Sequence, residues 1–186
     1  GRRCWTTFVF GFEEALGYCV GTVVRDKDGI GAAQVLMELA ADLKAQGQTL
    51  LDHLDALYRR HGLHVNRQVS VRLPGLDGRA RIEALMAGLR AQPPTEIASI
   101  AVRRSRDLAG ADAEGMGLPR SDVLIFELAD GGRIVVRPSG TEPKLKSYLE
   151  VREAVGADES VADARRRAEP RMAALAAWMD TVIGGE

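Results

Sequence analysis

The spacing of apolar residues divides the chain into two parts near Leu63. In the first part, an apolar run at Phe8–Phe10 predicts a strand, and the polar stretch Gly11–Gly17 predicts a loop. Apolar residues then recur at three- and four-residue spacings, which is typical of helices. They are Ala32, Leu36, Leu39 and Leu43 in one segment, and Leu51, Leu54 and Tyr58 in the next. The first part therefore predicts one strand followed by two helices.

Both of these helices carry capping residues in the sequence. Asp28 is a suitable N-cap for the first helix, and Gly47 fits its C-terminal end. Thr49 and Asp52 have the spacing of a capping box at the start of the second helix, which Gly62 ends. Because one strand without partners cannot form a stable sheet, we expect the first part to be the tail of a larger α/β domain.

The second part alternates apolar and polar residues in short segments, which is typical of half-buried strands. Strands are predicted at Val65–Leu73, Ile97–Val102, Val123–Leu128, Ile134–Val136 and Leu145–Val151, helices at Arg79–Ala91 and from about Ser160, and a loop at Ser105–Pro119. Asp130-Gly131-Gly132 has hairpin-turn chemistry, and Pro170 is expected to kink the last helix or split it in two. This order predicts an α+β domain with a mostly antiparallel sheet and helices on one face.

Charge and cysteine content exclude several classes of protein. The 186 residues carry a formal net charge of −1, so no overall field attracts nucleic acid or an anionic membrane. No apolar run is long enough to span a bilayer, and no signal-peptide pattern occurs. Cys4 and Cys19 lack the partners of a disulfide framework or a zinc site, which favours a reducing compartment. We therefore expect a cytoplasmic protein with no nucleic-acid or membrane partner.

The stretch from Arg137 to Lys144, Arg-Pro-Ser-Gly-Thr-Glu-Pro-Lys, carries the most informative chemistry. Arg137 can donate two parallel hydrogen bonds to phosphate oxygens, and Ser139 and Thr141 add hydroxyl donors. Gly140 allows backbone N–H groups to approach an anion closely. Serine, glycine and threonine are also common in ordinary connections between strands. The residues alone therefore leave both a phosphate site and a plain turn open.

Three motifs together resemble the α-D-phosphohexomutases, the phosphoglucomutase and phosphomannomutase superfamily. The stretch Arg137–Lys144 resembles the phosphate-binding loop in the fourth domain of that family. Gly11–Tyr18, Gly-Phe-Glu-Glu-Ala-Leu-Gly-Tyr, resembles the sugar-recognition loop of the third domain, and Arg25–Gly29 resembles the segment that follows it. The motifs occur in the family's order, and the resemblance covers nearly the whole chain.

The resemblance implies a domain organisation and an activity. Residues 1–63 correspond to part of domain three and residues 64–186 to domain four, with a TATA-binding-protein-like fold that implies no DNA binding. The implied activity is that of a phosphosugar mutase, an isomerase that transfers a phosphoryl group within hexose or pentose phosphates such as glucose 1-phosphate and glucose 6-phosphate. The family enzyme uses Mg²⁺ and a sugar bisphosphate activator. The implied partners are a sugar phosphate and the N-terminal domains of the same protein.

The resemblance also implies the roles of individual residues. The substrate phosphate is assigned to Arg137, Ser139, Gly140, Thr141, Lys144, Lys146 and Lys27, and the sugar hydroxyls to Glu13 and Glu14. Lys144 lies two residues before Lys146, so a strand would put both on one face. Many relatives have serine at the position of Ala15, which leaves the sugar preference open. Taken alone, paired glutamates and a single lysine are more typical of a solvated surface.

The parts of the family that perform phosphoryl transfer do not occur in this sequence. It contains no Thr-Ala-Ser-His-Asn-Pro-like segment and no Asp-x-Asp-x-Asp run, so it offers no catalytic serine and no metal loop. It begins with Gly1 and runs straight into a strand-like segment, so we expect a C-terminal fragment that is inactive alone and supplies only recognition. Two alternatives stay open: a stand-alone phosphosugar-binding module without catalysis, and a truncated gene product without function.

Overall fold

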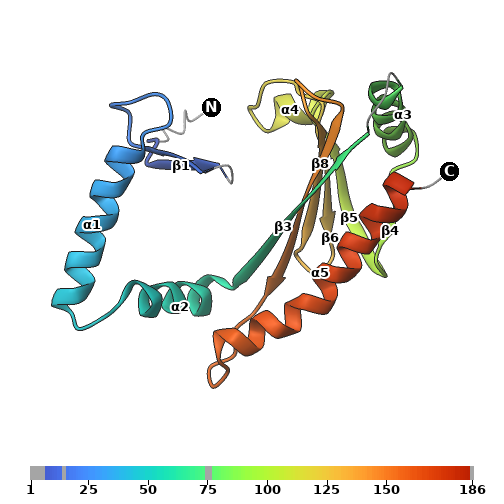
Figure 1. The fold of residues 1–186 in the computed structure, drawn as a ribbon. Helices are drawn as coiled ribbons and strands as arrows, with labels where there is room; N and C mark the ends of the chain where they lie inside the picture. The colour runs from blue at the N-terminus through green and yellow to red at the C-terminus, as the bar shows by residue number, and fades with distance from the viewer. Residues whose placement is uncertain (1–6, 14–15, 74–76, 185–186) are drawn as a thin grey trace. The chain divides into compact units, whose positions relative to one another are not determined.

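The computed structural model describes residues 7–13, 16–73 and 77–184. The chain divides into two compact units, residues 1–56 and 57–186, and each is described by itself (Figure 1). Among the described residues, no helix has both the length and the apolar character needed to cross a membrane.

The first unit contains two paired strands followed by a helix. Its elements are β1 (Phe10–Glu13), β2 (Gly17–Val20), α1 (Gly29–Ala45) and the start of α2 (Leu50–His61). The strands are antiparallel, with Phe10 opposite Val20 and Glu13 opposite Gly17. The prediction of a single strand followed by a loop at Gly11–Gly17 is therefore wrong. Gly11 to Glu13 pair with a second strand, and two strands of this kind satisfy each other's backbone groups.

The capping residues act as the sequence predicts. The Asp28 carboxylate accepts from two backbone N–H groups in the first turn of α1, at 3.0 and 3.1 Å. At α2, the Thr49 N–H donates to the Asp52 carboxylate at 2.8 Å, and the Asp52 N–H donates to the Thr49 hydroxyl at 3.1 Å. Gly47 and Gly62 follow the two helices with φ of 72° and 91°, a backbone conformation that favours glycine.

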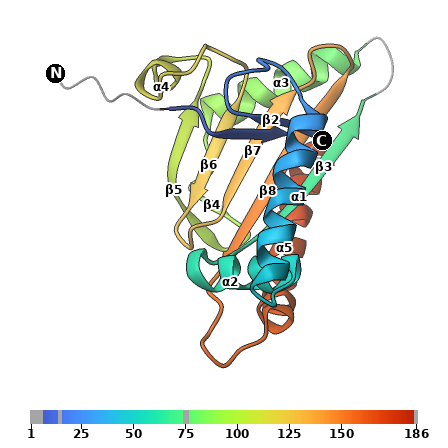
Figure 2. The ribbon, with the colours of Figure 1, turned by 90° about the vertical axis from the view of Figure 1, so that its left-hand side faces the viewer.

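The second unit is built on a six-stranded sheet in the order β3-β8-β7-β6-β5-β4, in which all neighbouring pairs are antiparallel. The strands are β3 (Leu63–Arg72), β4 (Glu96–Ile97), β5 (Ile100–Asp107), β6 (Leu124–Leu128), β7 (Arg133–Pro138) and β8 (Lys144–Glu153). Figure 2 shows β5, β6, β7, β8 and β3 side by side. This unit confirms the predicted antiparallel α+β architecture.

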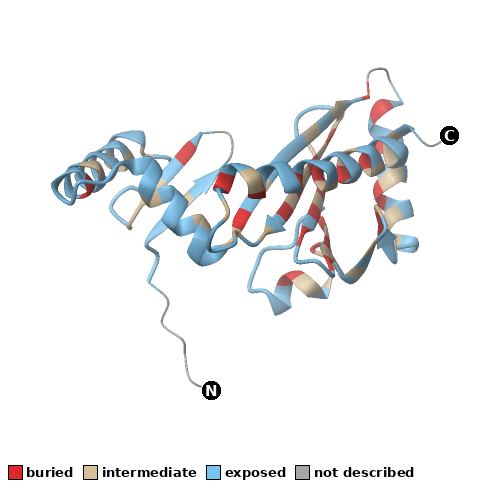
Figure 3. Ribbon diagram, turned by 90° about the horizontal axis from the view of Figure 1, so that it is seen from below, coloured by how far each residue is buried: buried red, intermediate tan, exposed pale blue. Residues whose placement is uncertain are grey.

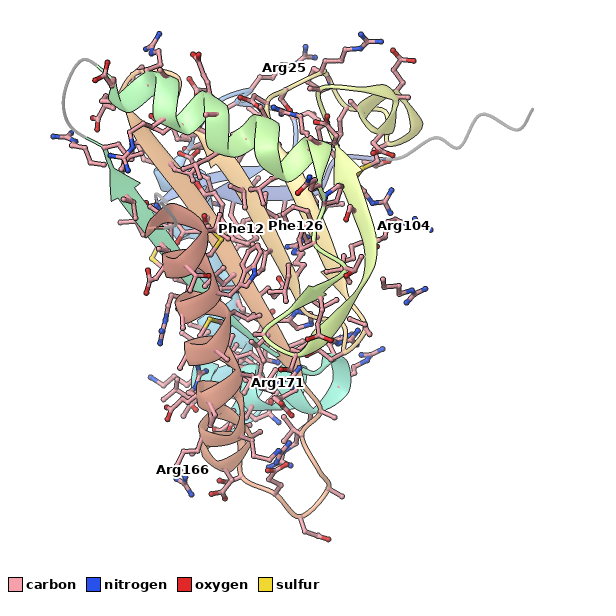
Figure 4. The ribbon with its side chains drawn as sticks, turned by 90° about the vertical axis from the view of Figure 1, so that its right-hand side faces the viewer. Phe12, Arg25, Arg104, Phe126, Arg166 and Arg171 are labelled. Carbon is pink, nitrogen blue, oxygen red and sulfur yellow. The ribbon has the colours of Figure 1, made fainter. Side chains whose placement is uncertain are left out.

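Helices lie on one face of this sheet. They are α3 (Gly78–Ala91) and α5 (Val161–Gly184), and a short helix, α4 (Ala111–Gly115), follows β5. Figure 4 looks onto α3 and α5, which lie in front of the strands. Because side chains alternate across a strand, every second residue of each strand packs toward these helices, and the others lie on the opposite face.

The core of the second unit lies between the sheet and the two long helices. Ile134, Leu149, Met172 and Leu175 are among its fully buried side chains. Phe126 packs edge-on against Trp178, with ring centroids 6.3 Å apart, a favoured geometry for aromatic pairs. Figure 3 shows buried residues recurring along α5 and the strands. Burial of this apolar surface is the main stabilising contribution to the unit.

Three segments of the second unit differ from the prediction. The predicted strand Ile97–Val102 is a hairpin of β4 and β5, and the predicted loop Ser105–Pro119 holds the end of β5 and α4. The end of β5 is polar, so the sequence there lacks the alternation of apolar residues that predicts a strand. This end is a strand because it pairs with β6. Of the two outcomes predicted at Pro170, the split is wrong, since α5 continues through this residue, and the kink stays a prediction. Buried residues on both sides, Ala168 and Met172, hold the helix against the sheet.

The turn between β4 and β5 is expected to gain stability from substitution. Ala98 and Ser99 have φ of 49° and 63°, whereas a two-residue turn with positive φ at both positions favours Asn-Gly. Replacing the pair with Asn-Gly is expected to raise the free energy of unfolding by about 1 kcal/mol, because the native backbone is less strained. Urea denaturation measures the change. An unchanged or lower free energy would show that this turn is not strained in solution.

Candidate functional site

The stretch Arg137–Lys144 connects β7 to β8, so the predicted loop joins two adjacent antiparallel strands. Arg137 lies directly opposite Lys146 in the ladder. The Ser139 N–H donates to the Lys144 carbonyl oxygen at 2.8 Å, and the Lys144 N–H donates to the Glu142 carbonyl oxygen at 2.8 Å. These bonds close the connection, so its side chains project from a fixed backbone.

Three cations of this region share the face of the sheet opposite α3 and α5. On β8, Leu145 and Ser147 are buried, whereas Lys144 and Lys146 are only partly buried. On β7, Arg137 is exposed next to a buried valine. Directly opposite residues have Cβ atoms about 5 Å apart, so Arg137 and Lys146 form a cationic pair on this face. Such a pair favours an anion between or above the two side chains.

The middle of the loop is open and retains free donors. A Cβ atom on Gly140 would meet no atom within 4 Å. The hydroxyls of Ser139 and Thr141 form no hydrogen bond with any described residue, and neither Arg137 nor Lys146 forms an ion pair with one. Donors of this kind remain available to a ligand, so the arrangement can hold a phosphate group.

Two of the predicted residues in the first unit, Glu13 and Lys27, both lie close to Gly17. A Cβ atom at Gly17 would lie 2.7 Å from Glu13 Oε1 and 2.7 Å from Lys27 Cδ. Lys27 Nζ lies 3.3 Å from Asp26 Oδ1. The hydrogen bond and charge of Asp26, and then the charge of Glu13, raise the pKa of Lys27. Lys27 therefore remains a cation beside the carboxylate of Glu13, with Gly17 leaving room for both side chains.

The backbone holds this cluster in place. The Asp28 N–H donates to the Tyr18 carbonyl oxygen at 2.6 Å, so the segment that carries Lys27 is fixed against β2. Glu14, the second predicted sugar ligand, and Ala15 lie outside the described residues. The structure thus brings Glu13 and Lys27 together in the first unit, and it brings Arg137, Lys144 and Lys146 together in the second.

The sequence patterns missed polar residues beside both groups. Asp26 belongs to one of the recognised motifs and could have been identified there as a partner of Lys27. Ser70 lies opposite Lys146 and Arg72 lies opposite Lys144, both on β3. No local pattern connects β3 with the loop, because only the pairing of β3 with β8 brings them together.

Among the residues that the structure describes, no group of His, Cys, Asp or Glu is arranged to hold a metal ion. The described residues therefore do not fit the Mg²⁺ that the family resemblance implies.

Comparison with known proteins gives consistent matches. Residues 81–168 match the family model for the phosphoglucomutase/phosphomannomutase C-terminal domain. A probable phosphomannomutase from Haemophilus influenzae is 46% identical over 156 residues, which cover 83% of this chain and 30% of that protein. A phosphoglucomutase from Staphylococcus aureus is 36% identical over 152 residues, which cover 77% of this chain and 27% of that protein. The chain thus spans less than a third of the length of these relatives.

A solved structure shows the same fold. The open form of pp63/parafusin, a phosphoglucomutase from Paramecium, aligns with 91% of this chain and 30% of its own, with a TM-score of 0.58 and 17% identity. At this identity the likeness concerns the fold alone, and the family assignment follows from the sequence matches. Residues 81–168 of this chain therefore belong to the C-terminal domain of the phosphoglucomutase/phosphomannomutase family.

Proposed function

We propose that this chain is the sugar- and phosphate-recognising part of a phosphosugar mutase, an isomerase that moves a phosphoryl group within a hexose or pentose phosphate. The single observation that carries the proposal is the pairing of Arg137 with Lys146 beside the open Gly140 loop. The relatives named phosphomannomutase and phosphoglucomutase support the same reaction class.

The proposed phosphate grip uses each predicted residue for a distinct contact. Arg137 donates two parallel hydrogen bonds to phosphate oxygens, and Lys146 and Lys144 add positive charge from the neighbouring strand. Ser139 and Thr141 donate from their hydroxyls, and Gly140 gives the ligand close access to the backbone. Binding a phosphate that does not react would orient the opposite end of the sugar for transfer.

The sugar contacts are assigned to the first unit. The Glu13 carboxylate can accept hydrogen bonds from two sugar hydroxyls, because each of its oxygens can accept separately. Lys27 lies beside it and is proposed as a further phosphate contact, and the same sugar-binding role is proposed for Glu14. In this assignment, residues 1–63 are part of the third domain and residues 64–186 are the fourth domain of the intact protein.

The reaction itself requires the N-terminal domains of the same protein. They would supply the phosphoserine and the Mg²⁺ ligands, and a sugar bisphosphate would act as the activator. Exposed apolar side chains of the first unit fit such a partner: Phe10, Leu16, Leu36 and Leu39 line an apolar groove of about 630 Å³. We expect the intact protein to work in a reducing cytoplasm.

A second candidate is a stand-alone phosphosugar-binding module. It is favoured by the lack of a metal ligand cluster among the described residues and of a catalytic serine segment in the sequence. Both candidates use the same binding residues. They differ in the activity of the intact protein, because only a mutase interconverts glucose 1-phosphate and glucose 6-phosphate.

Calorimetry on the 186-residue chain tests the recognition that both candidates share. Glucose 1,6-bisphosphate is expected to bind more tightly than glucose 1-phosphate, and glucose is expected to give no heat, because the proposed contacts are mostly to phosphate. Adding EDTA should leave the affinities unchanged, since no metal takes part. A folded chain that gives no heat with millimolar bisphosphate would contradict the recognition that both candidates share. If the bisphosphate binds, a mutase assay on the intact protein decides between the two candidates.

A further inference from the structure

The loop between β7 and β8 contains a carboxylate as well as the proposed phosphate ligands. Glu142 follows Thr141 directly and precedes Lys144 by two residues. An unpaired carboxylate here would repel a phosphate dianion and would compete with it for the cations of Arg137 and Lys146. A loop that binds phosphate therefore needs some means of offsetting the charge of Glu142.

Arg72 supplies a positive charge at this position. Arg72 Nη2 lies 2.6 Å from Glu142 Oε2, and Arg72 is opposite Lys144 in the ladder between β3 and β8. The hydrogen bond and charge of Arg72, with smaller effects of Lys144 and Lys146, hold the pKa of Glu142 below its ordinary value. Glu142 is thus ionised at neutral pH and is bonded to β3.

The backbone reinforces this connection between β3 and the loop. The Leu73 N–H, one residue after Arg72, donates to the Pro143 carbonyl oxygen at 3.0 Å. The second half of the loop is therefore held at β3 by a side-chain pair and by an adjacent backbone hydrogen bond. The first half, with Ser139 and Gly140, has no such bond to β3 among the described residues.

We infer that Arg72 is a positioning residue of the phosphate loop. It binds the Glu142 carboxylate, and so it keeps that carboxylate from pairing with the cations that would hold the phosphate. This inference rests on the proposed function of the loop. Arg72 itself touches Glu142 rather than the ligand, so it acts on phosphate affinity through the loop.

The pair contributes to binding much more than to folding. The side chains of Arg72 and Glu142 are 65% and 46% exposed, and ion pairs this exposed add little to stability because water and salt screen them. A released Glu142 carboxylate, however, would lie within a few residues of Lys144 and Lys146 and could pair with them. Loss of Arg72 should therefore lower ligand affinity while it leaves the unfolding temperature nearly unchanged.

The test is calorimetry with glucose 1,6-bisphosphate on variants of the 186-residue chain. Arg72→Ala is expected to weaken binding by about fivefold, as expected for one uncompensated charge near a solvated site. Adding Glu142→Gln to Arg72→Ala is expected to restore the affinity to within about twofold of the wild type, because the competing carboxylate is gone. If Arg72 had a purely structural role, adding Glu142→Gln would not restore the affinity for glucose 1,6-bisphosphate.

A matched control removes the same charge from the same strand. Arg67 lies on β3, is exposed, and forms no ion pair with the residues that the structure describes. Arg67→Ala should leave the affinity within about twofold of the wild type. Arg67 is far enough along β3 from the loop that water and salt screen the effect of its charge on the ligand. Arg72→Lys keeps a cation at β3 and should retain most of the affinity, which provides a second test if Arg72→Ala does not fold.

The outcomes separate this inference from the proposed function. Unchanged affinity in Arg72→Ala, failure of Glu142→Gln to restore it, or an equal loss in Arg67→Ala would overturn the role of Arg72. If Arg137→Ala weakens binding in the same series, the proposed phosphate site stands without Arg72. If Arg137→Ala has no effect either, the proposed function fails together with the inference.

Discussion

Replacing Arg137 with alanine is expected to weaken the binding of glucose 1,6-bisphosphate about 30-fold, which corresponds to about 2 kcal/mol. Arg137 is exposed on the face opposite the helices and forms no ion pair with the described residues, so its guanidinium is available to the ligand. Alanine removes both parallel hydrogen bonds and one positive charge. Calorimetry on the 186-residue chain measures the loss, with thermal unfolding to show that the fold persists.

A second arginine on the same strand serves as the control. Arg133 lies four residues before Arg137 on the same face of β7, about 13 Å away along the strand, and it pairs with Glu150 at 3.1 Å. Arg133→Ala should change the affinity by less than about twofold, because the ligand is held at the other end of the strand. An equal loss of affinity in both variants would indicate a general attraction of the protein to anions and would contradict a specific phosphate-binding site at Arg137.

Sequence patterns could identify the proposed phosphate loop, Arg137–Lys144, because its residues are close together in the chain. Arg137 and Gly140 lie in one short stretch, and the strand periodicity alone places Lys144 and Lys146 on one face. The contact between Arg72 and Glu142 spans 70 residues. It depends on which strand pairs with β8, and hydrophobic periodicity does not carry that information.

The first unit shows a different limit of sequence patterns. The predicted apolar face of α1 is correct in its spacing, but only Leu43 of that face is buried, and Leu36 and Leu39 are exposed. Periodicity predicts which face of a helix is apolar, whereas burial requires a surface to cover it. In the second unit, the end of β5 was predicted as loop for a different reason, because its polar residues are held by the ladder with β6 rather than by apolar packing.

Replacing Gly78 with alanine is expected to lower the free energy of unfolding by about 2 to 3 kcal/mol, the usual range for forcing extra atoms into a packed site. A Cβ atom there would lie 1.9 Å from the carbonyl oxygen of Leu73 and 2.9 Å from its carbonyl carbon. These are backbone atoms of a buried residue, so they cannot yield as the end of a flexible side chain can. Either α3 or the end of β3 must shift.

The same shift should reach the phosphate loop. The Leu73 N–H donates to the Pro143 carbonyl oxygen at 3.0 Å, so displacing Leu73 loosens the second half of the loop. We therefore expect Gly78→Ala to weaken the binding of glucose 1,6-bisphosphate as well as to destabilise the fold. Urea denaturation measures the first effect, and calorimetry below the unfolding transition measures the second.

Gly88 is the matched control within the same helix. A Cβ atom at Gly88 would meet no atom within 4 Å, so Gly88→Ala should raise the free energy of unfolding by about 0.5 to 1 kcal/mol through reduced backbone freedom in the unfolded chain. Opposite signs for the two substitutions would show that the close approach of Gly78 to Leu73, and not helix propensity, sets the stability here. If Gly78→Ala is as stable as Gly88→Ala, α3 does not start against the Leu73 carbonyl in solution, and the proposed coupling of that helix to the phosphate loop is wrong.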